Sequence, residues 1–405
     1  MVASISFLQL RKMQGVESIE AFRGVWRWWA LGGISPVKKY SSAFAIYSIF
    51  INISTTLFLP FSFIKQNLQE HDPRRILKNL AMTLTMVSFS IKHVLILFSK
   101  RNRNILKILQ KLDARVQSEE EIECIKSTIK LCRRLLFGYN VIFFTSYCNY
   151  LLTSLLNRGQ LIFPSWFPFD LTVKSNFWIA YVYQACALVV SLMQNIAHDV
   201  YPPIYISILT AHMQALSKRV RVIGWDSKDN GSKTYNKFVA CIEDHLDIIL
   251  FHEISAMIKQ TLFIQITVTA FVLCVGAVNL IFFATQFLEM VAISSYITAI
   301  ILEVFPACYF INQMTECYRG LNDSVYECNW INQDLKFKKA MIMFIQKTQQ
   351  NMIMSAGNIA PINLLTFLRV YQNLFCTNYN YILYFLLQIL KFSFSMFTLL
   401  SKLNK

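Results

Sequence analysis

Apolar segments of bilayer-spanning length recur along the chain, and the polar stretches between them hold most of the charged residues. A helix needs about 20 mostly apolar residues to cross the hydrocarbon core of a bilayer. Six such segments, and a seventh apolar region that begins near residue 353, predict an all-α polytopic membrane protein with seven transmembrane helices. The six predicted spans cover residues 41–64, 76–99, 134–156, 176–198, 262–288 and 291–314.

A long polar stretch, residues 199–261, separates spans four and five. It holds apolar residues at helical spacing on both sides of the loop WDSKDNGSKTYN, and such spacing is typical of a helix with one buried face. We expect span four to continue out of the membrane as a helix and a second helix to lead back into span five. A similar helical segment, 334–350, precedes the last apolar region.

The basic residues alternate between the two sides of the predicted spans. Lys and Arg number six in 1–40, ten in 100–134, seven in 199–261 and five in 315–350. The alternate connections hold four, two and none. Because loops rich in Lys and Arg stay in the cytoplasm, the N-terminus is predicted to be cytoplasmic. With an odd number of spans, the C-terminus is then extracellular.

The composition supports the membrane class and excludes several functions. Hydrophobic residues make up 55% of the chain and charged residues 15%, with a mean hydropathy of +0.41, whereas soluble domains average about 45–50% and about 25%. The net charge of +16 is explained by basic loops that face anionic lipid and requires no nucleic-acid partner. The chain has no phosphate-binding Gly loop, HExxH, GxSxG or Cys/His cluster, so we expect neither an enzyme nor a metal or cofactor site.

Two ionisable residues fall inside predicted spans, where charge is costly and usually faces a cavity or a partner. Lys92 lies near the inner end of span two, and we expect its side chain to reach the membrane surface. Glu303 lies nearer the middle of span six, and the sequence favours neither a functional nor a structural role for it.

Polar aromatic residues gather in the outer halves of spans three, four and six, among them Tyr150, Trp178 and Tyr296. They form either an interfacial aromatic belt or an apolar pocket with hydroxyl groups for a small volatile molecule.

The segment from 317 to 367 carries the most specific motif. It reads CYRGLNDSVYECNWINQDLKFKKAMIMFIQKTQQNMIMSAGNIAPINLLTF: a Cys-Tyr near the end of span six, an Asn-Trp step, a basic helix, then a small-residue turn and Thr-Phe entering span seven. This segment resembles insect odorant receptors, and so do the terminal ILKFSFSMFTLLSK and the MQALSKRV after span four. The long cytoplasmic insertion of that family's co-receptor is absent, which indicates a ligand-specific subunit.

The resemblance implies a role for several residues. Members of the family form odorant-gated, non-selective cation channels as tetramers with the co-receptor, in the plasma membrane of sensory dendrites. Lipid and a small volatile ligand would be the other partners. The implied ligand-binding residues are Met86, Phe89, Tyr147, Tyr150, Trp178, Tyr181 and Tyr296. A hydrophobic pore gate is implied at Leu399 and Leu403, and the cytoplasmic region 315–352 would anchor subunits through Trp330, Phe337 and Phe344.

Two other functions stay open on the sequence alone. A gustatory receptor of the same superfamily would end in a Thr-Tyr, five apolar residues and Gln-Phe; TNYNYILYFLLQI imitates this motif only in part. A secondary transporter would show an internal repeat or paired broken helices, and we find no symmetry between two halves. A G-protein-coupled receptor is disfavoured by the predicted orientation.

The last apolar region, 353–405, is too long for one span and short for two. Without residues 370–388 the chain reads PINLLTFLR followed by ILKFSFSMFTLLSKLNK, which is one pore helix of normal length. Val370 has a codon that begins with GT, and Gln388 can be encoded by CAG, as at the two ends of an intron. Our hypothesis is that 370–388 is a translated intron, and the alternative is a genuine insertion. A continuous helix from Pro361 to Leu400 would be about 60 Å long, twice the hydrocarbon thickness.

Overall fold

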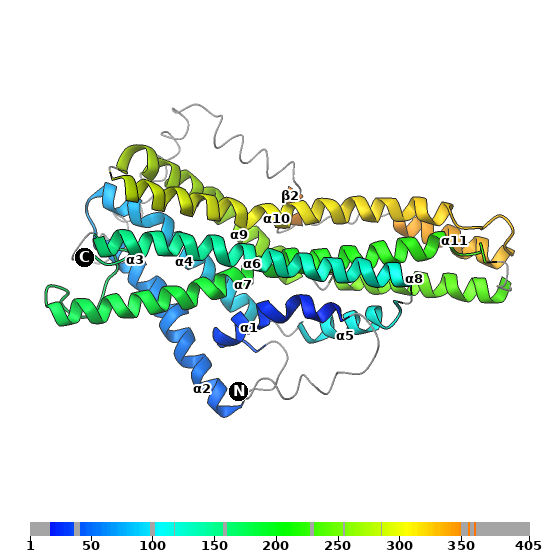
Figure 1. Ribbon diagram of the computed structural model, residues 1–405, viewed down its shortest axis with the longest axis horizontal. Helices are drawn as coiled ribbons and strands as arrows, with labels where there is room; N and C mark the ends of the chain where they lie inside the picture. Colours follow the sequence, from blue (N-terminus) through cyan, green and yellow to red (C-terminus); the bar gives the residue numbers. More distant parts are fainter. Residues whose placement is uncertain are drawn as a thin grey trace, which may run out of the picture.

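Long helices that run along one common axis form the bulk of the fold (Figure 1). The computed structural model describes residues 17–35, 41–97, 102–116, 118–156, 160–226, 231–253, 256–284, 286–349, 355–356 and 360–361. Within these residues six helices are long and apolar enough to cross a membrane. Each coincides with most of one segment predicted as spans one to six, so the existence of these six spans is confirmed. The prediction for span five, 262–288, ends too late, because its helix and the turn that follows it end at Phe283 and the next helix begins at Phe287.

Span one is one continuous helix with a widened middle. It consists of α2 (Ser42–Ile51), the π-helical turn η3 (Asn52–Phe58) and α3 (Leu59–Gln69). Ser41 caps its start by accepting a hydrogen bond from the backbone N–H of Phe44, which satisfies one of the otherwise unpaired amides of a first turn. Span two is α4 (Pro73–Leu97), and span five is α9 (Ala256–Val278), which ends in the π-helical turn η4 (Asn279–Phe283).

Three helices extend far beyond a bilayer. They are α6 (Glu119–Leu156), α7 (Lys174–Arg221) and α10 (Phe287–Tyr326), with 38, 48 and 40 residues. At 1.5 Å per residue they are about 57, 72 and 60 Å long, against about 30 Å of hydrocarbon. The predicted extension of span four is therefore confirmed, and spans three and six have extensions that the hydropathy pattern did not predict.

The extensions pack together into what we call the base, on the right in Figure 1. The base consists of the first half of α6, the second halves of α7 and α10, and three shorter helices: α5 (Asn102–Asp113), α8 (Gly231–Glu253) and α11 (Leu335–Thr348). Helices α8 and α11 confirm the two helices predicted from apolar spacing. Phe238 of α8 packs against Phe337 and Phe344 of α11, with ring centroids 4.5 and 5.8 Å apart. The opposite half, which carries the loop 160–173, is called the loop half.

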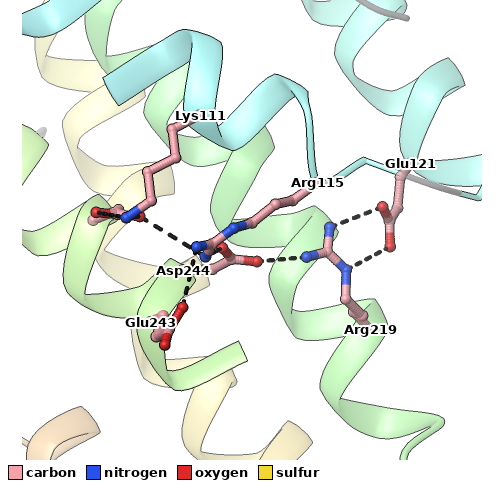
Figure 2. Close-up of polar contacts among 7 residues, drawn as sticks. Lys111, Arg115, Glu121, Arg219, Glu243 and Asp244 are labelled. Carbon is pink, nitrogen blue, oxygen red and sulfur yellow. Dashed lines mark hydrogen bonds and ion pairs between the residues drawn. The ribbon is translucent and has the colours of Figure 1, made fainter. Parts of the chain in front are cut away.

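Ion pairs connect four helices of the base (Figure 2). Arg219 of α7 lies between Glu121 of α6 and Asp244 of α8, at 2.9 and 2.5 Å. Arg115, just after α5, pairs with the same Asp244 and with Glu243 at 3.1 Å. Asp244 is 3% exposed and accepts hydrogen bonds from both guanidinium groups. The network therefore fixes α5 and α6 against the α7–α8 pair.

The N-terminal segment adds a short helix that the sequence analysis did not predict. The 3-10 turn η2 (Ser18–Phe22) leads into α1 (Arg23–Leu31). Phe22, Val25 and Trp29 are spaced three and four residues apart, and all three are buried against the rest of the bundle. That spacing is typical of a helix with one buried face. It extends over too few residues to predict a helix, because α1 is short.

Of the last predicted region, 353–405, the structure describes only residues 355–356 and 360–361. Two short strands, β1 (Ser355–Ala356) and β2 (Ala360–Pro361), pair antiparallel with Ser355 opposite Pro361. Leu399 and Leu403, predicted for the pore gate, and the segment 370–388 lie outside the described residues.

Candidate functional site

A cleft of about 990 Å³ lies in the loop half. Its walls come from α3, α4, α6, α9 and α10, and the loop that precedes α7 covers one side. Its lining combines apolar and aromatic side chains with polar ones. The first group includes Met82, Tyr150, Ile162, Phe163, Ile293 and Tyr296, and the second includes Gln66, Gln160 and Gln286. Small-molecule sites are usually concave, apolar spaces of about 300–1,000 Å³ with a few polar groups, so this cleft is the candidate ligand site.

Charged residues mark the mouth of the cleft. Lys78 of α4 pairs with Glu289 in the first turn of α10, at 2.8 Å. Arg75 lies 3.9 Å from both Glu70 and Asp72. Every one of these side chains is at least 22% exposed to solvent, so their ion pairs contribute little stability.

The covering loop is held by hydrogen bonds from three helices. Gln184 of α7 donates to the carbonyl of Phe163 and accepts from its backbone N–H, at 2.8 and 3.2 Å. Ser62 of α3 donates to the carbonyl of Trp166 at 2.6 Å, and Asn79 of α4 donates to that of Pro164 at 3.0 Å. Because these bonds attach the middle of the loop to three helices, the loop forms a wall of the cleft.

Helices α9 and α10 approach closely at the back of the cleft. Gly276 makes this possible, since a Cβ atom there would lie only 3.1 Å from Ile297 Cγ1. The close packing aligns the first turns of α10, and Ala292, Ile293 and Tyr296 all line the cleft. Their spacing of one, three and four residues places them on one face of the helix.

The structure brings some of the predicted ligand residues together. Tyr150 and Tyr296 both line the cleft, with ring centroids 6.1 Å apart in an edge-to-face arrangement. The Tyr296 hydroxyl bonds to that of Thr85 of α4 at 2.6 Å. Met86, Tyr147 and Tyr181 lie next to this wall, in the cluster that also packs Tyr150.

The two other predicted ligand residues lie elsewhere. Phe89 is deeper in the bundle, fully buried against His93 and His198. Trp178 is 49% exposed on the outer face of α7, where it contacts Tyr181. No contact with a ligand tests these seven assignments, and they stay predictions. Sequence reasoning missed Asn79 and Asn279, which also line the cleft; the signal was a polar amide within an apolar helical run.

A buried lysine joins four helices below the cleft, and we call this cluster the lysine hub. Lys92 of α4 donates to Asp199 of α7 at 2.6 Å and to Asn195 at 3.1 Å. It also donates to Gln265 of α9 and lies 3.6 Å from Glu303 of α10. The Lys92, Asp199 and Glu303 side chains are each 2% exposed.

The prediction that Lys92 reaches the membrane surface is therefore wrong. The ammonium group points into the bundle because α7, α9 and α10 present four polar side chains to it. A buried charge is tolerated when it is paired and hydrogen-bonded. Glu303, whose role the sequence left open, belongs to the same cluster, and its backbone carbonyl accepts a hydrogen bond from Tyr139 of α6 at 3.0 Å.

A chain of buried hydrogen bonds runs beside the lysine hub. The indole N–H of Trp29 donates to His198 Nδ1 at 3.0 Å, and His198 Nε2 lies 3.1 Å from His93 Nδ1. Since an indole can only donate, His198 Nδ1 is the acceptor, and its Nε2 carries the proton that bonds to His93. These hydrogen bonds attach α1 to α7 and α4. The N-terminal helix α1 therefore contacts the same region of the bundle as the lysine hub.

The predicted anchor residues lie in the base. Phe337 and Phe344 are 0% and 2% exposed and pack against α8 of the same chain, and Trp330 packs at the edge of this core. The exposed face of α11 carries other apolar residues, Leu335, Ile342 and Met343. Burial lowers the pKa of the nearby His245 imidazole to about 4, and its ring stacks on Tyr318.

Comparisons with known proteins agree with the motifs and the fold. The profile of the family described as 7tm Odorant receptor matches residues 72–375. Odorant receptor 2a of Drosophila melanogaster is 29% identical over 93% of this chain and 94% of its own length, and Odorant receptor 42a is 27% identical over 92% and 89%.

A solved structure shares the fold. The insect olfactory receptor OR5 from Machilis hrabei superposes with a TM-score of 0.79 at 15% identity, over 94% of this chain and 99% of the other. Its structure in complex with eugenol gives 0.79 at 14% identity, over 92% and 100%. These relatives are receptors and not enzymes, and they favour neither the gustatory receptor nor the transporter alternative. The chain is thus a multi-pass membrane protein that belongs to the odorant receptor family.

Proposed function

We propose that this chain is the ligand-binding subunit of an odorant-gated, non-selective cation channel that assembles with a co-receptor. The observation that supports this most is the cleft lined by Tyr150 and Tyr296, in a fold similar to that of a receptor whose structure includes eugenol. A volatile molecule that buries about 300 Å² of apolar surface gains about 7 kcal/mol before the cost of association. The subunit would work in the plasma membrane of a sensory dendrite, with its N-terminus in the cytoplasm.

Coupling from the cleft to the rest of the channel would pass along α4 and α10. Thr85 contacts Tyr296 at the cleft wall, and Lys92 lies next to Glu303 in the lysine hub. Each partner is seven residues further along its helix, which is two turns or about 10.5 Å. Both contacts therefore share one register, and we call these two side-chain contacts the α4–α10 seam. A ligand that binds better when the seam is shifted would increase the population of the shifted state.

The pore and the assembly follow from the resemblance. Leu399 and Leu403 would form an apolar ring that stops ions when water leaves it. Subunits would meet at the base, where the exposed Leu335, Ile342 and Met343 of α11 are available to a neighbour. Trp330, Phe337 and Phe344 would then act indirectly, by fixing α11 on α8.

Cation currents in cells that express this chain with a co-receptor test the proposal. We expect Tyr150→Ala to raise the half-maximal concentration of an activating volatile about ten-fold or more, because the edge-to-face contact with Tyr296 and the apolar wall are both lost. Tyr309→Ala is the matched control, since Tyr309 lies on α10 but is 47% exposed. If variants of Tyr150 and Tyr296 reach the surface and keep the wild-type dose–response curve, the cleft is not the ligand site.

A further inference from the structure

Two buried asparagines in the wall of the cleft have an unpaired carbonyl oxygen. Asn79 of α4 is 2% exposed and Asn279 of η4 is 4% exposed, and both line the cleft. Within the described part of the chain, neither side-chain oxygen has a hydrogen-bond partner. A buried acceptor without a partner costs about 1–3 kcal/mol, so each of these oxygens favours an incoming donor.

The neighbours fix which amide atom is the oxygen. Asn79 Nδ2 donates to Asn67 Oδ1 and to the carbonyl of Pro164, both at 3.0 Å. Asn279 Nδ2 donates to the carbonyl of Leu77 at 3.2 Å. All three partners are acceptors, so a rotated amide would place oxygen against oxygen. The free atom at each asparagine is therefore the acceptor.

The other polar groups of the cleft do not supply the missing donors. The hydroxyls of Thr153 and Ser154 donate to the carbonyls of Asn149 and Gln160, at 2.8 and 3.0 Å. The cations at the mouth are already in ion pairs with acidic side chains. Among the described residues, the cleft thus holds two buried acceptors that have no donor, and a ligand that carries a hydroxyl group would supply one.

We propose that the cleft selects neutral volatile alcohols and phenols, whose hydroxyl group donates to the Asn79 or Asn279 carbonyl oxygen. This inference rests on the proposed function, because it assigns a ligand class to the same cleft. The apolar remainder of the ligand lies against Met82, Tyr150 and Ile293. A methyl ether of the same skeleton keeps the apolar contacts and loses the donor, so it binds more weakly.

The test is a panel of hydroxyl compounds, each paired with its methyl ether, applied to cells that express the receptor with a co-receptor. Suitable pairs are benzyl alcohol with benzyl methyl ether, and 1-hexanol with hexyl methyl ether, extended over a range of chain lengths. We expect the activators to be hydroxyl members, each about ten-fold more potent than its ether. A panel in which the ethers are equally potent, or in which no hydroxyl member activates, overturns the proposal.

Substitution of the asparagines tests whether they cause the preference for hydroxyl compounds over their methyl ethers. Asn279→Leu, which is close in shape, should weaken hydroxyl members about ten-fold and leave the ethers unchanged; Asn79→Leu serves as a second variant. The matched control is Asn140→Leu, because Asn140 of α6 also donates to a carbonyl and has an unpaired oxygen but does not line the cleft. Equal weakening of both members of each pair by Asn279→Leu contradicts the assignment.

The two proposals fail in different ways. If Tyr150→Ala impairs activation while alcohols and ethers respond alike, the cleft binds ligand but has no preference for a donor. If neither the Tyr150 nor the Asn279 variant changes any response at normal surface expression, the ligand site lies elsewhere and the proposed function of the cleft fails.

Discussion

Replacing Lys92 with Met should destabilise the protein far more than the same change at Lys78. Both lysines lie on α4, and each has a carboxylate oxygen within 2.8 Å, Asp199 and Glu289 respectively. They differ in exposure, because the Lys92 side chain is 2% exposed and the Lys78 side chain is 41% exposed. The pair of variants therefore isolates the effect of burial on one kind of contact.

The expected magnitudes follow from what each change leaves behind. Removing Lys92 leaves the Asp199 carboxylate buried without its cation, and such a change costs about 3–5 kcal/mol. Removing Lys78 breaks an exposed pair that contributes about 0.2–1 kcal/mol. At about 2 °C per kcal/mol, Lys92→Met should lower the melting temperature by about 6–10 °C and Lys78→Met by at most about 2 °C.

Thermal unfolding of the detergent-solubilised protein, followed by fluorescence-detected gel filtration, measures both shifts. A triple variant, Lys92→Met with Asp199→Leu and Glu303→Leu, should regain most of the lost stability, since replacing every charged member of a buried ionic cluster with apolar residues is often neutral. Equal shifts for the two single variants, or no recovery in the triple variant, would refute the account of the lysine hub.

Three further predictions concern the base and the tail. Asp244→Asn should cost about 2–3 kcal/mol, because Asp244 bonds to both Arg115 and Arg219 and bonds to charged groups contribute about 1.5–3 kcal/mol each; Glu243→Gln, at an exposed site, is the control in the same unfolding assay. The pKa of His245 is lowered from 6.5 to about 4 by burial, so the unfolded state binds the extra proton first and stability falls as the pH drops from 6.5 towards 4. His245→Phe should remove about 2 kcal/mol of the loss between pH 7 and pH 5, and an unchanged pH dependence would contradict this. Genomic and transcript sequencing should find GT and AG at the ends of codons 370–388 and a spliced transcript without them; a genomic sequence that lacks either boundary excludes the intron.

The six spans could be predicted from sequence because each needs only a local run of apolar residues. The base was harder to predict from sequence, because the halves of α6 and α10 that belong to it mix charged and apolar residues. Their apolar residues are buried only when these helices pack against one another. Residues 199–221 were the exception: their apolar spacing continued directly from span four. In η2 and the short α1, the large apolar residues that are fully buried are only Phe22, Val25 and Trp29, which is too few for a periodic signal.

The candidate site was predictable only in part for a related reason. Tyr150 and Tyr296 lie in the cleft as expected, because aromatic residues in the loop half of adjacent spans tend to meet. The direction of Lys92 depended on partners 103 to 211 residues away in sequence, and no local window contains them. One clue was available: Asn195 and Asp199 are four residues apart on one face of an apolar helix, which indicates a polar partner inside the bundle.

The seam between α4 and α10 limits how the receptor can change its ligand range. Thr85 with Tyr296 and Lys92 with Glu303 share one register, so a substitution that shifts the first contact also displaces the second. The covering loop lines the ligand space and is held by Ser62, Asn79 and Gln184, which lie outside that register. We therefore expect receptors of this design to diverge in odour preference through the covering loop, while the α4–α10 seam keeps the transmission of the signal constant.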